Sequence, residues 1–164
     1  MASSDGLTGT PAGSSTPAGS GTPAGSGADA SAGAACLRLV RAGELSDATA
    51  QTAGMARAAA ISGDLVGAQS LWMGRTTLPP GISSGDHHHG HSETGIYVAS
   101  GNPVFVFRDP DSGQLVRLEA QPGDYVWVPP QVRHREENPS ADVAAVVVIA
   151  RSTQEAIVVN VDQL

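Results

Sequence analysis

From Leu71 onward, the chain consists of short apolar segments separated by glycine- and proline-containing turns at intervals of about ten residues. This spacing leaves room for strands but not for long helices. The turns fall at residues 79–81, 101–103 and 109–113. The predicted strands cover residues 69–78, 94–99, 104–107, 115–118, 125–128, 134–138, 143–150 and 157–161.

Two earlier segments are less regular. Residues 37–41 alternate between apolar and charged side chains, which predicts another strand. Residues 46–60 are rich in alanine and threonine, and we expect a turn of helix there before a short strand. Since no long segment has helical apolar spacing, and no glycine-rich phosphate loop opens a helix, the pattern indicates an all-β sandwich or barrel.

The first 35 residues have a different composition. The hexad Thr-Pro-Ala-Gly-Ser-x occurs three times, starting at Thr10, Thr16 and Thr22, and large apolar side chains are almost lacking. Such a segment cannot bury enough apolar surface to offset the entropy of ordering it. We therefore expect residues 1–35 to form a disordered low-complexity tail and residues 36–164 to form one folded domain.

Charge and cysteine content exclude several classes of function. The net charge is −7, and the nine basic residues are all arginine, so a nucleic-acid-binding surface, Schiff-base chemistry and a phosphate-loop lysine are not expected. Cys36 is the only cysteine, which rules out an intrachain disulfide. The longest apolar run, residues 143–150, is too short to span a bilayer, and no targeting signal is visible, so we expect a cytoplasmic protein without membrane contact.

Histidine is concentrated at two places. Four of the five histidines lie between Asp86 and Glu93, and the fifth is His134. On a strand, His87 and His89 would share one face and His88 the other. Imidazole and carboxylate groups together suit a divalent metal ion, so these residues predict a metal site. The alternative is a solvated histidine-rich loop that binds metal only adventitiously.

The spacing of these residues resembles the two sequence motifs of the cupin superfamily. The first motif corresponds to Gly81, five residues, His87 and His89, three residues, Glu93 and, after seven more, Gly101. The second corresponds to Gly123, five residues, Pro129-Pro130-Gln131, two residues, His134, three residues and Asn138. Gln131 stands where the family usually has glycine, so we expect this turn to form without a left-handed residue.

The resemblance implies a cupin double-stranded β-helix, or jelly-roll barrel, with its core motifs at residues 81–101 and 123–138. It further implies one divalent transition metal (Fe, Mn, Ni, Cu or Zn) bound by His87, His89, Glu93 and His134. His91 is the alternative ligand, since it shares the sequence parity of His87 and His89 but is expected in a turn.

Other candidate residues follow from side-chain chemistry. Tyr97 and Glu136 are candidates for catalysis, because each lies an even number of residues from a predicted ligand and would share a strand face with it. Three arginines could bind a substrate carboxylate: Arg57, Arg75 and Arg133.

The resemblance implies a metal-dependent enzyme that acts on a small oxygen-bearing organic substrate, with a dioxygenase preferred over an isomerase or lyase. The alternative is a non-catalytic module that binds or senses a small molecule or metal. Since many single-domain cupins associate, we also expect a homodimer, with residues 37–40 a candidate for strand exchange.

Overall fold

The computed structural model describes residues 36–154 and 157–164, so the predicted tail at residues 1–35 lies outside the described residues. The chain divides into two units, Met1–Cys36 and Leu37–Leu164. The second unit contains the following elements: β1 (Ala56–Ile61), α1 (Gly63–Val66), β2 (Trp72–Leu78), β3 (His87–His88), β4 (Thr94–Ser100), β5 (Val104–Arg108), β6 (Leu115–Glu119), β7 (Tyr125–Val128), β8 (His134–Glu137), β9 (Ala145–Arg151) and β10 (Val159–Asn160).

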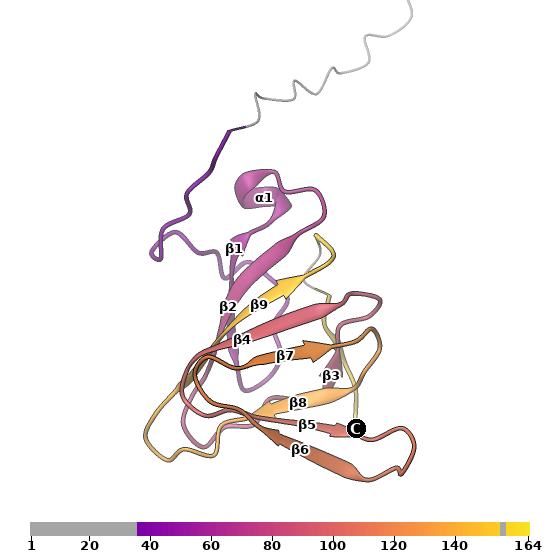
Figure 1. The fold of residues 1–164 in the computed structure, drawn as a ribbon. Helices are drawn as coiled ribbons and strands as arrows, with labels where there is room; N and C mark the ends of the chain where they lie inside the picture. Colours follow the sequence, from indigo (N-terminus) through magenta and orange to yellow (C-terminus); the bar gives the residue numbers. More distant parts are fainter. Residues whose placement is uncertain (1–35, 155–156) are drawn as a thin grey trace, which may run out of the picture. The chain divides into compact units, whose positions relative to one another are not determined.

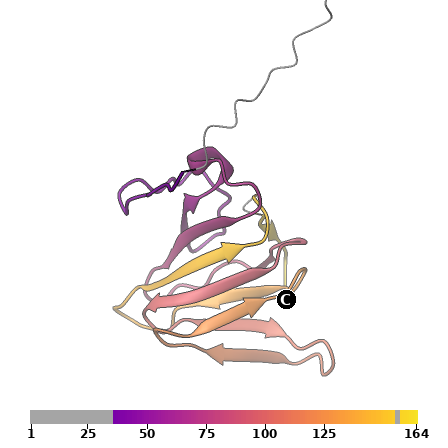
Figure 2. The same ribbon diagram turned by 45° about the horizontal axis from the view of Figure 1, so that its top comes forward.

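The strands form two antiparallel sheets that face each other across the core (Figure 1). One sheet has the order β1-β2-β9-β4-β7 and the other β10-β3-β8-β5-β6, so successive strands repeatedly cross between the sheets. Figure 2 shows the same two layers after a 45° turn. The prediction of an all-β jelly-roll barrel is confirmed.

The largest errors of the sequence-based prediction lie before β2. Residues 37–41 form no strand, and the side chains of Leu37 and Leu39 are exposed to solvent. No helical turn occurs within residues 46–55, where Ser46 instead makes an isolated bridge to Ala59 of β1. The short helix follows the strand and does not precede it; Ser62 caps it, and its hydroxyl accepts a hydrogen bond from the Leu65 amide.

Alternation along the strands places apolar side chains between the sheets. In β9, Ala145, Val147 and Ile149 are buried, and the residues between them are only half-buried. Ile96 and Val98 of β4 face the same interior. Burial of these side chains provides the main driving force for joining the two sheets.

The turn before β8 contains a left-handed residue after all. Gln131 has φ 64° and is the only described non-glycine residue with positive φ. Its amide donates a hydrogen bond to the Gly90 carbonyl at 2.8 Å, which ties this turn to the turn that follows His89. Our expectation about Gln131 was therefore wrong: its backbone adopts the left-handed conformation that glycine adopts more easily.

Asn138, at the end of β8, joins three segments of backbone. Its buried amide nitrogen donates to the carbonyls of Leu78, Pro79 and Val143 at 2.8–3.1 Å. We expect Asn138→Ala to lower the free energy of unfolding by about 2–4 kcal/mol, since it leaves these carbonyls without their donor. Urea unfolding would measure this, with the exposed Asn102→Ala as control. Equal stability of the two variants would contradict the assignment.

Candidate metal centre

Three histidines come together in the interior. His87 of β3 and His134 of β8 are direct partners across neighbouring antiparallel strands, so both side chains extend from the same face of the sheet. His89 lies two residues beyond His87 and returns to that face. One ring nitrogen from each histidine lies within 4.8 Å of the others, and all three residues are buried. The structure thus brings together three of the four ligands expected from the sequence.

Hydrogen bonds orient two of these rings. His87 Nδ1 lies 2.9 Å from the Gly85 carbonyl, and His134 Nδ1 lies 2.9 Å from the Val132 carbonyl. Because a carbonyl can only accept, each Nδ1 carries the proton and each Nε2 keeps a free lone pair. Both Nε2 atoms and both ring nitrogens of His89 are buried without a hydrogen-bond partner. Buried ring nitrogens with free lone pairs are suited to bind a shared divalent metal ion, and the three histidines could hold one.

Burial keeps two of the rings neutral. It lowers the pKa of His87, although the carboxylate of Glu136 acts in the opposite direction. It also lowers the pKa of His89, and the nearby cations Arg151 and Arg57 lower it further. Neutral imidazole is the form that binds metal.

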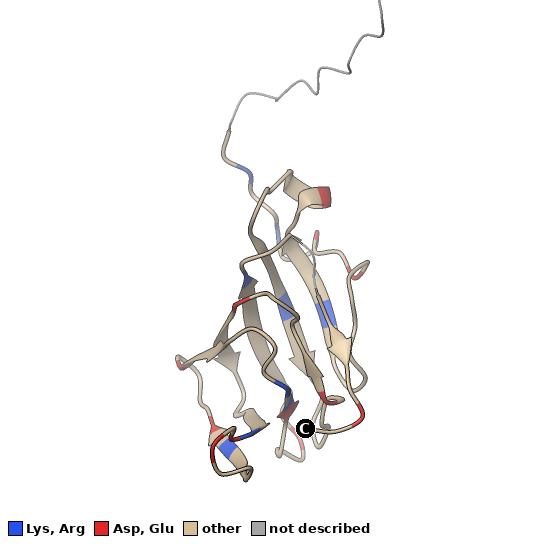
Figure 3. Cartoon of the chain, turned by 90° about the vertical axis from the view of Figure 1, so that its right-hand side faces the viewer, with Lys and Arg blue, Asp and Glu red and all other residues tan. Residues whose placement is uncertain are grey.

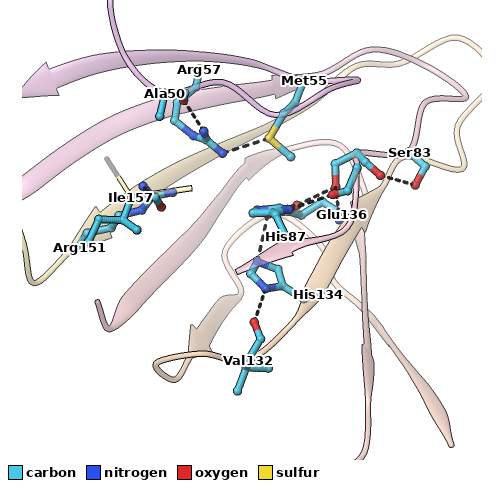
Figure 4. Close-up of polar contacts among 12 residues, drawn as sticks. Ala50, Met55, Arg57, Ser83, His87, Val132, His134, Glu136, Arg151 and Ile157 are labelled. Carbon is cyan, nitrogen blue, oxygen red and sulfur yellow. Dashed lines mark hydrogen bonds and ion pairs between the residues drawn. The ribbon is translucent and has the colours of Figure 1, made fainter. Parts of the chain in front are cut away.

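Glu136 is the carboxylate that adjoins this cluster. Its side chain lies on β8 two residues beyond His134 and is almost completely buried. Its carboxylate oxygens lie 3.8 Å from His87 Nε2 and 3.8 Å from His134 Nε2 (Figure 4). The Ser84 hydroxyl donates to the same carboxylate at 3.1 Å and accepts from the Glu136 amide at 3.0 Å.

The surroundings of Glu136 favour its ionised form. Burial alone would raise the pKa of this carboxyl group. The neighbouring His87, His134 and Arg57, together with the Ser84 hydroxyl, outweigh burial and lower the pKa below its ordinary value. Glu136 is therefore a carboxylate at neutral pH, which can bind a metal ion or accept a proton.

The structure does not bring Glu93 to the histidines. Glu93 is exposed, whereas its neighbour Thr94 is buried with an unpartnered hydroxyl. In β4 the buried positions are Thr94, Ile96 and Val98. Thr94 follows His89 after four residues, whereas Glu93 follows it after three. The assignment of Glu93 as a ligand therefore disagrees with the structure. Before the turn at residues 90–91 the odd-numbered residues His87 and His89 point inward, whereas after it the even-numbered residues of β4 do.

Tyr97 also points away from the interior, because the odd-numbered residues of β4 face outward. Its side chain is partly exposed, and its ring packs beside Tyr125 of β7 at a centroid distance of 5.0 Å. His91 is also exposed, in the turn where we expected it. His88 is half-buried, and its Nδ1 accepts a hydrogen bond from the Gly90 amide at 3.1 Å. Neither His91 nor Tyr97 belongs to the buried cluster.

The three candidate arginines differ in how deeply they are buried. Arg75 and Arg133 are exposed, whereas Arg57 of β1 is almost completely buried. Sequence reasoning missed a second buried arginine, Arg151, at the end of β9. The available signal was the alternation of this strand, since Arg151 shares the inward parity of Val147 and Ile149. Figure 4 shows both buried arginines on the sheet that faces His87.

A pocket of about 780 Å³ reaches the cluster at His134. Its walls are largely apolar and include Phe105, Phe107 and Val126, with Arg108 and Arg133 among the polar lining residues. A largely apolar pocket with a few polar lining groups is typical of a small-molecule site. His134 therefore belongs both to the buried cluster and to the wall of this pocket.

Charged residues elsewhere are scattered. Figure 3 shows acidic residues mainly in loops and arginines in both loops and strands.

None of the helices in the described residues has the length and hydropathy needed to cross a membrane.

The fold and the buried histidine cluster together define a β-barrel protein with a potential metal centre between two antiparallel sheets. Residues 74–150 match the family model of the cupin domain, so this part of the chain is identified as a cupin domain. No curated protein sequence gives a significant match.

Solved structures share the fold at low sequence identity. Peruvianin-I, a cysteine peptidase from Thevetia peruviana latex, aligns with a TM-score of 0.59 at 19% identity, covering 68% of this chain and 69% of that one. An oxalate oxidase in complex with the substrate analogue glycolate aligns with a TM-score of 0.58 at 19% identity, covering 66% and 55%. The Bacillus subtilis oxalate decarboxylase, described with Mn(II) centres, aligns with a TM-score of 0.60 at 18% identity, covering 71% and 30%. The chain thus spans about half of the oxidase and less than a third of the decarboxylase.

Proposed function

We propose that this protein is a metal-dependent enzyme that acts on a small oxygen-bearing organic molecule. The observation that carries the proposal is the set of unpartnered, buried imidazole nitrogens on His87, His89 and His134. We assign the fourth ligand position to Glu136 in place of Glu93. This set of three imidazoles and one carboxylate suits Fe, Mn, Ni, Cu or Zn and leaves coordination positions open.

The residues at the metal centre have separate roles in this proposal. A bound divalent metal supplies Lewis-acid chemistry, or electron transfer if it is redox-active. Gly85 and Val132 fix the tautomers of His87 and His134 through their carbonyls. Glu136, held by Ser84, either completes the ligand set or accepts a proton from the substrate. The apolar pocket walls exclude water from the substrate.

The structural neighbours support a small oxygen-rich substrate. Oxalate oxidase and oxalate decarboxylase share the fold, and both are named for a substrate with two adjacent carboxylates. Within the metal-dependent class we prefer a dioxygenase to an isomerase or lyase. The cytoplasmic location and the homodimer stay predictions; exposure of Leu37 and Leu39 is consistent with a role of this segment in dimerisation.

Metal analysis of protein purified without added metal or chelator tests the proposal. We expect about one transition-metal ion per chain. Stoichiometric iron followed by oxygen uptake with oxalate, diketones, phenols or thiols would support the dioxygenase, and zinc or nickel without oxygen dependence would support an isomerase or lyase. Bound metal without turnover would favour the non-catalytic alternative. Failure to bind any of the five metals would overturn the proposal.

A further inference from the structure

Two arginines are buried opposite the histidine cluster. Arg57 and Arg151 each have a relative exposure of 1%, and they lie on β1 and β9 of the sheet that faces His87. Burying a charged group without a partner is costly, so arginines in such positions normally pair with a carboxylate. In the described part of the chain, neither guanidinium forms an ion pair.

Backbone carbonyls hold one side of each guanidinium and leave the other side free. Arg57 Nη1 donates to the Ala50 carbonyl at 2.5 Å, and its Nη2 lies 3.4 Å from the sulfur of Met55. Arg151 Nη1 donates to the Ile157 carbonyl at 3.0 Å. Arg57 Nε, Arg151 Nε and Arg151 Nη2 are buried and have no hydrogen-bond partner. Guanidinium groups fixed in this manner present preorganised donors.

The charges at the site do not balance. Glu136 is the only buried acidic side chain within residues 36–154 and 157–164, so one carboxylate faces two guanidinium groups. Although burial lowers the pKa of Arg151 to about 9, this side chain remains a cation at neutral pH. A divalent metal ion at the histidines would add two more positive charges. Among residues 36–154 and 157–164, the buried positive charges therefore exceed the buried negative charges, and a bound anion would balance them.

We propose that Arg57 and Arg151 bind the carboxylate of a small organic acid whose second oxygen-bearing group reaches the histidine cluster. This inference rests on the proposed function and names its substrate class: small dicarboxylates or oxo-acids. The free donors on the two guanidinium groups match the paired acceptors of a carboxylate. An uncharged analogue of the same shape would leave the excess positive charge uncompensated.

Trp72 provides a readout for binding. The Arg151 guanidinium lies 5.2 Å from the centroid of the buried Trp72 ring. The chain contains two tryptophans, and the other, Trp127, is exposed. In the Trp127→Phe background, the fluorescence of Trp72 therefore reports on events at Arg151. We would titrate this protein with malonate and, separately, with the uncharged malonamide, in both metal-free and metal-loaded form.

We expect saturable binding of malonate and at least about 10-fold weaker binding of malonamide. Arg151→Gln should weaken malonate binding by about 10- to 100-fold, whereas the exposed Arg75→Gln should leave it unchanged. If Arg151→Gln does not fold, Arg151→Lys, which keeps the charge but loses the planar fork, should show a smaller loss. The comparison of malonate with malonamide needs no variant at all.

The outcomes separate this inference from the proposed function. Arginine-dependent malonate binding by metal-free protein supports the inference even if no metal binds. Metal binding without preference for malonate over malonamide overturns the inference and leaves the proposed function standing. Equal malonate affinity in the parent protein and a folded Arg151→Gln variant likewise overturns it.

Discussion

Replacing His134 with alanine is expected to weaken metal binding by a factor of about 100 or more. His134 is a partner of His87 in the strand register, and its Nε2 is buried without a hydrogen-bond partner. Removing one of three imidazoles from so small a cluster leaves an incomplete ligand set. Elemental analysis of the purified variant, followed by competition titrations with Mn²⁺ and Zn²⁺, would measure the loss.

His91→Ala is the matched control for this variant. His91 belongs to the same histidine-rich segment but lies exposed in a turn. We expect this variant to bind metal as tightly as the parent protein. Circular dichroism would establish that the His134→Ala variant keeps its β-structure. Full metal content in a folded His134→Ala protein would show that the proposed coordination is wrong.

Glu136→Gln is expected to lower metal affinity by about 10- to 100-fold, while Glu93→Gln leaves it unchanged. Glu136 is buried with its oxygens 3.8 Å from two of the imidazole nitrogens, and Glu93 is exposed. Glutamine keeps the size of the side chain, removes its charge and replaces one acceptor oxygen with an NH2 donor. The contrast between the two variants therefore tests which carboxylate serves the site.

The same titrations measure both glutamate variants. Thermal unfolding in the absence of metal provides the control, because Glu136 is also a buried acidic group near Arg57 and its loss can change stability. A loss of metal affinity in Glu93→Gln equal to that in Glu136→Gln would contradict our assignment and favour the motif spacing that ends at Glu93.

Strand alternation made most of the fold predictable from sequence. Turn residues such as those at 109–113 and apolar runs such as 143–150 mark the strands from β2 onward except β3, and the structure contains these strands with shifts of a few residues. Residues 37–41 have the same alternating pattern but form no strand. Local pattern alone cannot distinguish a strand from an exposed segment, because a strand also needs a neighbour with which to pair.

The histidine cluster was predictable because its residues lie on strands with fixed parity. Glu136 was a candidate for the same reason, since it lies two residues after His134 on β8. The inward face of β4 was not predictable, because the turn between His89 and Thr94 decides which of its residues point inward. Counting parity across a turn assumes an uninterrupted strand, and that assumption moved Glu93 and Tyr97 to the wrong face. Arg151 could have been found from the parity of β9, had the charged end of an apolar run been considered a buried position.

The two sheets contribute different groups to the interior. The sheet with β3 and β8 carries His87, His134 and Glu136, and the opposite sheet carries Arg57 and Arg151. The separation of the sheets is maintained by core side chains such as Ile149, which a bound acid need not touch. Under our proposal, the length of acid that fits between arginines and histidines is therefore set by hydrophobic packing. Substitutions in this core would change substrate selectivity without altering any residue that binds the substrate.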